Sequence, residues 1–388
     1  MALTTIARVT GQRAHAAGGA SALEAEVHLR CGASGRAVVP IGARGRTAHG
    51  GVHEIATVVD AALHGLDVRR SGHIDASLTR LNTYSPMRVG ADVLAACSIA
   101  ALRAAAEAAG QPLFRYLRPE AARVPRVMAT TLVAAAPDTA LARLSVMPIA
   151  AAGAEEALDA CAAVHAAVAA ASSPPPRGAV PSFEDDERGL DALATAIERA
   201  GLVPGGEIVI VAELNALRDD ASARGPRGEL LAGWVERYPI AVLEDRFAAV
   251  DRACAEPHAR AGFGSLLRVG SAAPAACDAG LLGEHGGRKL CGAIIAVPEQ
   301  AGTASDVLAA FEAARRAGWD TAVAADAIGA EDAATVHLAV GWGAGILKLG
   351  SVADGANAAR WNELLRIDAA LARGTRHARR RAAAHRVH

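Results

Sequence analysis

Lysine and aromatic residues are scarce in this chain of 388 residues. Lys289 and Lys348 are the only lysines, and phenylalanine, tryptophan and tyrosine together supply 3% of the chain. The core must therefore be packed by aliphatic side chains and alanine. The hydrophobic fraction of 52% is still large enough to bury a sizeable core. This fraction excludes an intrinsically disordered chain.

An excess of charge of one sign is also missing. The 40 basic and 41 acidic residues leave a formal charge of −1, which gives no overall attraction to nucleic acid or to an anionic membrane. The sequence has no run of 18 apolar residues, and Arg8 and Arg13 interrupt any signal peptide. The six cysteines are scattered and lack zinc-site spacing, as is typical of reduced thiols. We expect a cytoplasmic protein that contacts no membrane, and its overall charge does not favour nucleic acid as a partner.

The pattern of apolar residues divides the chain near Pro125. Before it, three strand-like segments (3–10, 23–31 and 35–40) precede helical ones (52–63 and 90–109). After it, short apolar segments alternate with helical runs, which predicts a parallel sheet. The strand-like segments there are 207–212, 240–244, 266–269, 293–297, 321–324 and 345–348. Their number favours a (β/α)8-type barrel over an open doubly wound sheet.

Several short motifs follow one another in an order that resembles enolase (phosphopyruvate hydratase). They span residues 5–370, and no single one is decisive, but the ordered set is specific. The motifs are Gly35-Arg-Ala-Val-Val-Pro40, Ser98-Ile-Ala-Ala-Leu-Arg-Ala-Ala-Ala, Pro112-Leu-Phe-Arg-Tyr-Leu117, Tyr238-Pro-Ile-Ala-Val-Leu-Glu-Asp245, Gln300-Ala-Gly-Thr303, Ile346-Leu-Lys-Leu-Gly350 and Arg360-Trp-Asn-Glu-Leu-Leu-Arg-Ile-Asp368.

The resemblance implies a fold and an activity. It implies an N-terminal α+β cap domain over residues 1–122 and a β/α barrel of the enolase kind over 123–370, with the site at the carboxyl ends of the strands. Enolases are lyases that dehydrate 2-phosphoglycerate with a lysine base and two Mg²⁺ ions. They are commonly homodimers, so a homodimer formed through the cap domain is implied here, as is a role in glycolysis.

The residues at the family's functional positions depart from its pattern. The three metal ligands correspond to Glu213, Glu244 and Ser271, which implies a degenerate, weak magnesium site. The lysine base corresponds to Val297, which cannot take a proton. Asp326 stands in the loop where an arginine holds the substrate phosphate. Lys348 is retained and corresponds to the lysine that contacts the substrate carboxylate.

These departures leave three hypotheses open. The first is an enolase-like protein that has lost phosphopyruvate hydratase activity and acts through ligand binding or assembly. The second is a divergent Mg-dependent lyase or isomerase on a small carboxylate, with Lys348 as base or carboxylate clamp. The third is an ordinary phosphopyruvate hydratase.

The carboxylates at the barrel mouth also allow more than one arrangement. Lys348 would neutralise Glu213 and Glu244 in the place of a lost metal ion, because buried carboxylates need such pairing. A weak Mg²⁺ or Ca²⁺ site completed by Ser271 and water is an alternative. A pocket for a small ligand is a third option.

The last 18 residues form a basic segment. Residues 371–388 contain six arginines and no acidic residue. We expect a solvated, poorly ordered tail. Binding to nucleic acid or to an acidic partner is the alternative, although no aromatic residues lie between the arginines.

Overall fold

The computed structural model describes residues 3–41, 46–84, 89–135, 139–171, 180–215, 226–245, 267–270, 293–299, 301–325 and 330–384. The N-terminal part begins with an antiparallel sheet of β1 (Ile6–His15), β2 (Ser21–Leu29) and β3 (Ser34–Pro40), in that order. Alternate residues of β2, from Leu23 to Leu29, are buried. This alternation places one face of the sheet against helices, as a period of two requires.

The helices on this sheet are α1 (Ala48–Glu54), which continues through a π turn (Ile55–Val59) into α2 (Asp60–Leu63), followed by α3 (Ser71–Tyr84), α4 (Ala91–Ala108) and α5 (Leu113–Leu117). The alanine-rich α4 is buried along most of its length and packs closely on β3. A β-carbon at Gly35 would overlap the backbone of Ala104. Glycine at this position therefore permits the close approach of strand and helix.

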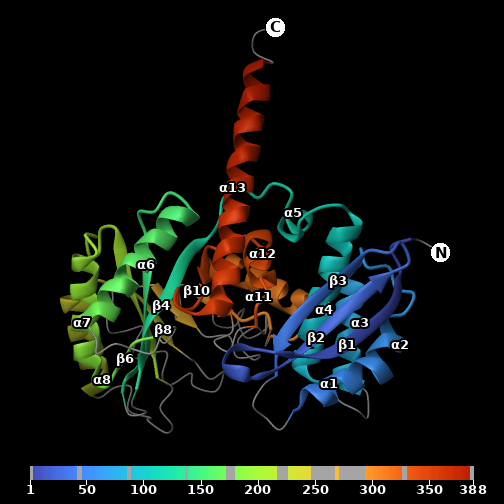
Figure 1. Ribbon diagram of the computed structural model, residues 1–388, viewed down its shortest axis with the longest axis horizontal. Coiled ribbons are helices and arrows are strands. Elements are labelled where there is room, and N and C mark those ends of the chain that lie inside the picture. The colour runs from blue at the N-terminus through green and yellow to red at the C-terminus, as the bar shows by residue number, and fades with distance from the viewer. Residues whose placement is uncertain are drawn as a thin grey trace.

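The second part is a closed ring of eight strands. They are β4 (Arg126–Ala134), β5 (Leu141–Pro148), β7 (Ile208–Leu214), β8 (Ile240–Asp245), β9 (Leu267–Gly270), β10 (Ala293–Ala296), β11 (Asp320–Ala324) and β12 (Ile346–Lys348). Pairing of β12 with β4 closes the ring, and the short β6 (Ser182–Phe183) is added to β4. The helices that the described residues of the barrel form are α6 (Ala154–Ala171), α7 (Asp186–Arg199), α8 (Pro226–Arg237), α11 (Ala304–Arg316), α12 (Ala334–Gly341) and α13 (Gly355–Ala384) (Figure 1).

The predicted α/β barrel with an N-terminal α+β cap domain is confirmed, with one difference. Strand β5 is antiparallel to both β4 and β7, whereas the alternation of strands and helices predicts a wholly parallel sheet. The reason is the length of the connection: β4 ends at Ala134 and β5 begins at Leu141, and the six residues between them are too few for a crossover helix. A strand that follows its neighbour without a crossover must run in the opposite direction.

Alternate residues of the ring point inward and form a small apolar core of their own. This core contains Met128, Met147, Val209, Val211, Val242, Ala293, Ile295, Ala322, Ala324 and Ile346. The other face of the strands packs on the helices and belongs to the larger core. Inward-pointing residues that lie beyond this layer, at the carboxyl ends of the parallel strands, are placed to form a site.

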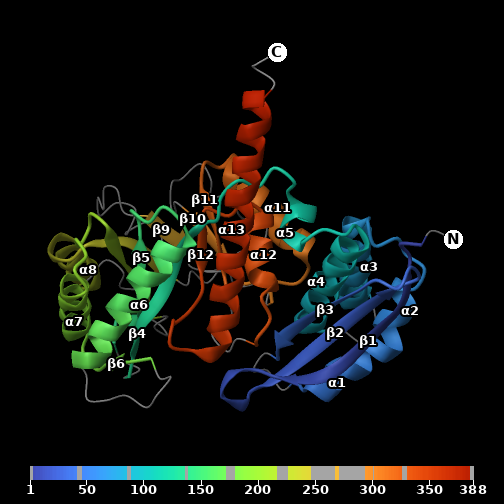
Figure 2. The same cartoon turned by 45° about the horizontal axis from the view of Figure 1, so that its top comes forward.

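Polar contacts join the cap to the barrel. The buried Asp75 of α3 accepts hydrogen bonds from Ser98 of α4 and from both the backbone and the hydroxyl of Ser305, at the start of α11. Arg103 of α4 forms an ion pair of 2.8 Å with Asp332, just before α12. Figure 2 shows the two parts side by side, with α11 and α12 on the barrel side nearest the cap.

The C-terminal segment differs from our expectation. Helix α13 continues through residues 371–384, where we expected a poorly ordered tail, and it projects beyond the rest of the molecule in both views (Figures 1 and 2). Helix propagation from an anchored first half adds residues without the cost of a new nucleus, which explains how the helix extends. Within the described ranges, no helix is long and apolar enough to cross a membrane.

Candidate functional site

Three of the residues singled out in the sequence meet inside the barrel. Glu213, Glu244 and Lys348 each lie two residues beyond an inward-pointing apolar residue, namely Val211, Val242 and Ile346. The period of two therefore directs all three side chains to the interior. Glu213 and Glu244 are also register partners on β7 and β8. They form a charged layer directly above the apolar one.

Lys348 makes two short ion pairs in this layer. Its Nζ donates to Oε2 of Glu213 at 2.8 Å and to Oε2 of Glu244 at 2.6 Å. All three residues are buried, with exposed fractions of 2% for Glu213, 6% for Glu244 and 7% for Lys348. Charge-assisted hydrogen bonds of this length are strong, and they offset part of the cost of removing three charges from water.

A fourth charged residue, Arg143, joins the cluster. It is the register partner of Glu213 on the antiparallel strand β5, and its Nη1 lies 3.2 Å from both carboxylate oxygens of Glu213. Our sequence analysis did not predict this contact. The signal was the alternation along β5, where Arg143, Ser145 and Met147 share one face and Leu144 and Val146 share the other.

The surroundings of Lys348 favour its charged form. Burial alone lowers the pKa of a lysine, but the negative charges of Glu244 and Glu213 outweigh burial and raise the pKa of Lys348 above its ordinary value. Its ammonium group is therefore charged at neutral pH.

The other predicted site residues either lie apart from the charged layer or fall outside the described residues. Val297 directly follows β10 and packs on the apolar layer of the barrel interior. Ser271 and Asp326 lie outside the described residues. The backbone of Asp245 ends β8 and is paired with Gly270.

The charged layer was also tested as a metal site. In the described part of the chain, no group of three or more His, Cys, Asp or Glu side chains could hold a metal ion. Glu213 and Glu244 are both bonded to Lys348, and Arg143 adds a second positive charge. Counted over these four described residues, two negative and two positive charges balance, whereas a hard divalent cation needs anionic oxygen ligands. As arranged here, these residues do not fit Mg²⁺.

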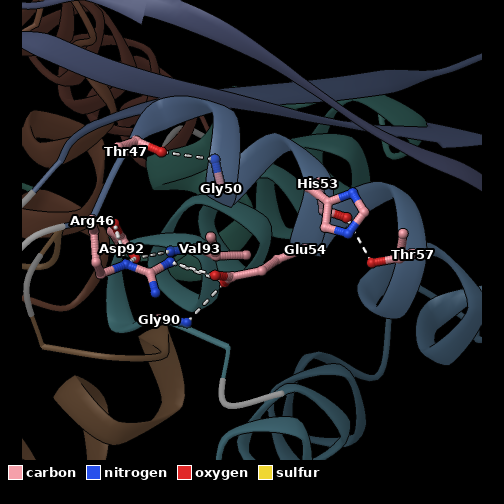
Figure 3. A network of polar contacts seen from close by, with 9 residues as sticks. All are labelled: Arg46, Thr47, Gly50, His53, Glu54, Thr57, Gly90, Asp92 and Val93. Carbon is pink, nitrogen blue, oxygen red and sulfur yellow. Dashed lines mark hydrogen bonds and ion pairs between the residues drawn. The ribbon is translucent and has the colours of Figure 1, made fainter.

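A second, partly buried charge network lies in the cap domain (Figure 3). Arg46 is bonded to Glu54 of α1 and to Asp92 at the start of α4, each at a closest distance of 2.9 Å, and Glu54 also accepts the backbone N–H of Gly90. Burial lowers the pKa of Arg46, but its bonds to Glu54 and Asp92 outweigh burial and raise it. Every charge in this network is paired, which indicates a structural clamp between α1 and α4.

Comparison with known protein families matches both parts of the chain to domains of one family. Residues 43–117 match the model of the enolase N-terminal domain, and residues 226–385 match that of the enolase C-terminal TIM barrel domain. The two matches follow the order cap, then barrel, that the structure has. They agree with the barrel and the N-terminal cap domain of the structure. The chain belongs to the enolase family.

Proposed function

We propose that this enolase-family chain does not dehydrate 2-phosphoglycerate and acts instead through binding or assembly. The observation that carries the proposal is the position of Lys348 Nζ, 2.8 Å from Glu213 and 2.6 Å from Glu244. The resemblance assigns these two carboxylates to Mg²⁺ and this lysine to the substrate carboxylate. In the present arrangement all three groups are occupied by one another.

The residue at the position of the general base supports the same proposal. The resemblance places the catalytic lysine at Val297, whose side chain lies on the apolar layer of the barrel. A general base must reach the substrate and accept its proton, and this step is typically worth about 10²–10⁴ in rate. Valine can do neither. Loss of the base, together with the replacement of one metal ligand by Ser271, would remove the chemistry of the parent reaction.

A divergent lyase on a small carboxylate is less well supported by the geometry. Such an enzyme would need a free base or a free cation at the barrel mouth. Lys348 is held between two carboxylates, and Arg143 contacts Glu213. We therefore favour a protein without a proton-transfer step at this cluster.

The experiment is a measurement of phosphoenolpyruvate formation from 2-phosphoglycerate at saturating Mg²⁺. We expect the wild-type protein and a Lys348→Ala control to show the same background rate. A Val297→Lys variant tests whether restoring the base alone is sufficient, and we expect it to stay at background because the carboxylates remain paired with Lys348. Turnover of the wild-type protein that requires both Mg²⁺ and Lys348 would contradict the proposal.

A further inference from the structure

Helix α5 is the last helix before β4, the first strand of the barrel, and it lies against α12 of the barrel (Figures 1 and 2). The two helices approach closely, because a β-carbon at Gly341 of α12 would overlap the side chain of Leu117 of α5. Helix α5 has only five residues, and a helix of this length is not stable without tertiary contacts. Its contacts with α12 therefore hold it in place.

His337 of α12 supplies a hydrogen bond that α5 does not make within itself. The first N–H groups of a helix have no partner in that helix, and Pro112 at the N-cap makes no side-chain bond to them. Instead, the N–H of Phe114 donates to Nδ1 of His337 at 3.4 Å. The imidazole also stacks on the ring of Phe114, with 5.9 Å between the ring centroids. In this arrangement Nδ1 accepts a hydrogen bond and therefore carries no proton.

The other ring nitrogen of His337 is turned towards α13. Nε2 lies 3.1 Å from Oε1 of Glu363, to which it donates in the neutral tautomer. The second carboxylate oxygen of Glu363 accepts a hydrogen bond from Arg366 at 2.8 Å, so this carboxylate already has a cation beside it. Because Nε2 holds the proton of the neutral ring, an added proton goes to Nδ1, opposite the N–H of Phe114.

The charged groups around His337 come from four parts of the structure. They are Glu363 and Arg366 of α13, Arg103 of α4, Asp332 just before α12, and Arg115 of α5, which lies over the Phe114 ring. Burial lowers the pKa of His337, and together with the charge of Arg103 it outweighs Glu363 and Asp332, which raise this pKa. The neutral imidazole is therefore the stable form at neutral pH.

We propose that protonation of His337 is a switch that releases α5 from α12. The added proton turns Nδ1 from an acceptor into a donor that faces the N–H of Phe114, so a repulsive contact replaces a hydrogen bond. When α5 moves away, the imidazolium keeps its bond to Glu363 and gains contact with water. The cap stays attached elsewhere, for example through the ion pair of Arg103 with Asp332. The switch is separate from the charged layer of the barrel and does not rest on the proposed function.

The pH range of the switch follows from the direction of the pKa shift. The pKa of His337 is lower while α5 is docked than after its release, when it approaches the ordinary value of about 6.5. The stabilisation of the docked state by neutral His337 is therefore complete above about pH 6.5 and is lost as the pH falls through the docked-state pKa. Between these two pKa values, we expect the opening equilibrium of α5 to rise by up to about tenfold per pH unit, because opening takes up one proton.

The test is amide hydrogen exchange of residues 113–121 between pH 7.5 and 5.0, corrected for the intrinsic exchange rates. We expect the protection of this segment to fall with pH while that of α7 stays constant. In His337→Asn, the amide oxygen stands where Nδ1 stands and takes up no proton, so protection should not depend on pH. Glu363→Gln removes a charge that favours the imidazolium, so the fall should move to lower pH. The control, His73→Asn, replaces an exposed histidine of α3 and should keep the wild-type profile.

An NMR titration of the imidazole C–H signals gives the midpoint of His337, whose signal is the one missing from His337→Asn. Circular dichroism shows whether each variant is folded, and if His337→Asn is not, the shift in Glu363→Gln decides. The proposal is overturned if residues 113–121 are equally protected at pH 7.5 and 5.0, or if a folded His337→Asn loses protection as the wild type does. An unshifted profile in Glu363→Gln, or equal loss of protection in α7, would also overturn it.

Discussion

Replacement of Lys348 by methionine is expected to lower the free energy of unfolding by about 3–5 kcal/mol, because it leaves buried carboxylates without their cation. Glu213 and Glu244 are register partners on adjacent strands, both almost fully buried, and Lys348 is the residue that bonds to both. Of the two glutamates, Arg143 is bonded to Glu213. Methionine has nearly the same side-chain length as lysine, so the decrease in stability measures the effect of removing the charge. Urea denaturation of the two proteins gives the difference in the free energy of unfolding.

A matched variant separates charge from packing. Lys348→Met combined with Glu213→Gln and Glu244→Gln removes both anions together with the cation, and replacing a whole buried ionic group by neutral residues is often nearly neutral for stability. We expect this triple variant to regain most of the loss. If Lys348→Met were within about 0.5 kcal/mol of the wild type, the size of an ordinary surface substitution, the cluster would not be a buried ion-pair network.

The pH dependence of this difference has a definite sign. The folded-state pKa of Lys348 lies above its value in the unfolded chain, so the folded state binds the proton more tightly. The contribution of Lys348 to stability is therefore complete below the unfolded-state pKa of about 10.4 and is lost as the pH rises through the folded-state pKa. On the alkaline side, the difference between the wild type and Lys348→Met should therefore shrink as the pH rises through the folded-state pKa of Lys348.

The second large effect is a gain of metal binding. Removing both cations with Lys348→Ala/Arg143→Ala leaves Glu213 and Glu244 as neighbouring anionic oxygen ligands with space for water between them, which suits a hard divalent cation. We expect Ca²⁺ or Mg²⁺ to raise the thermal midpoint of this variant, by an amount equivalent to about 2.7 kcal/mol at a metal concentration of 100 Kd. The wild type is expected to show no such rise.

The control for metal binding adds Glu244→Gln to the double variant. This change removes one anionic ligand and should abolish the stabilisation by metal, while a nonspecific ionic effect would persist. Equal stabilisation of the wild type and the double variant by Mg²⁺ would contradict the account, because it would mean that metal binds without displacing Lys348.

Part of this architecture could be predicted from the sequence alone. The ordered motifs and the alternation of apolar segments after Pro125 predicted the cap and the barrel, because both depend on local patterns. Glu213, Glu244 and Lys348 could be placed at strand ends for the same reason. That Lys348 bridges the two glutamates was one of three arrangements that the sequence left open, since only distances distinguish it from a metal site.

Other features depend on contacts that a sequence pattern does not contain. Arg143 reaches Glu213 only because β5 runs antiparallel to β7, and the sequence analysis did not identify β5 as a strand. The run of arginines after Leu371 gives no apolar periodicity, so its helical backbone follows from continuity with the anchored first half of α13. In both cases the feature depends on the surrounding structure, which a local sequence pattern does not contain.

The most direct test of the central claim is nitrogen NMR of the lysine side chains, since the chain has only Lys289 and Lys348. A Lys289→Arg variant assigns the signals. The account predicts that Lys348 is a charged, slowly exchanging ammonium group at neutral pH, and that neither Mg²⁺ nor 2-phosphoglycerate moves its signal. A Lys348 signal that shifts on addition of Mg²⁺ would contradict the account, because the metal would then take the place that we assign to the lysine.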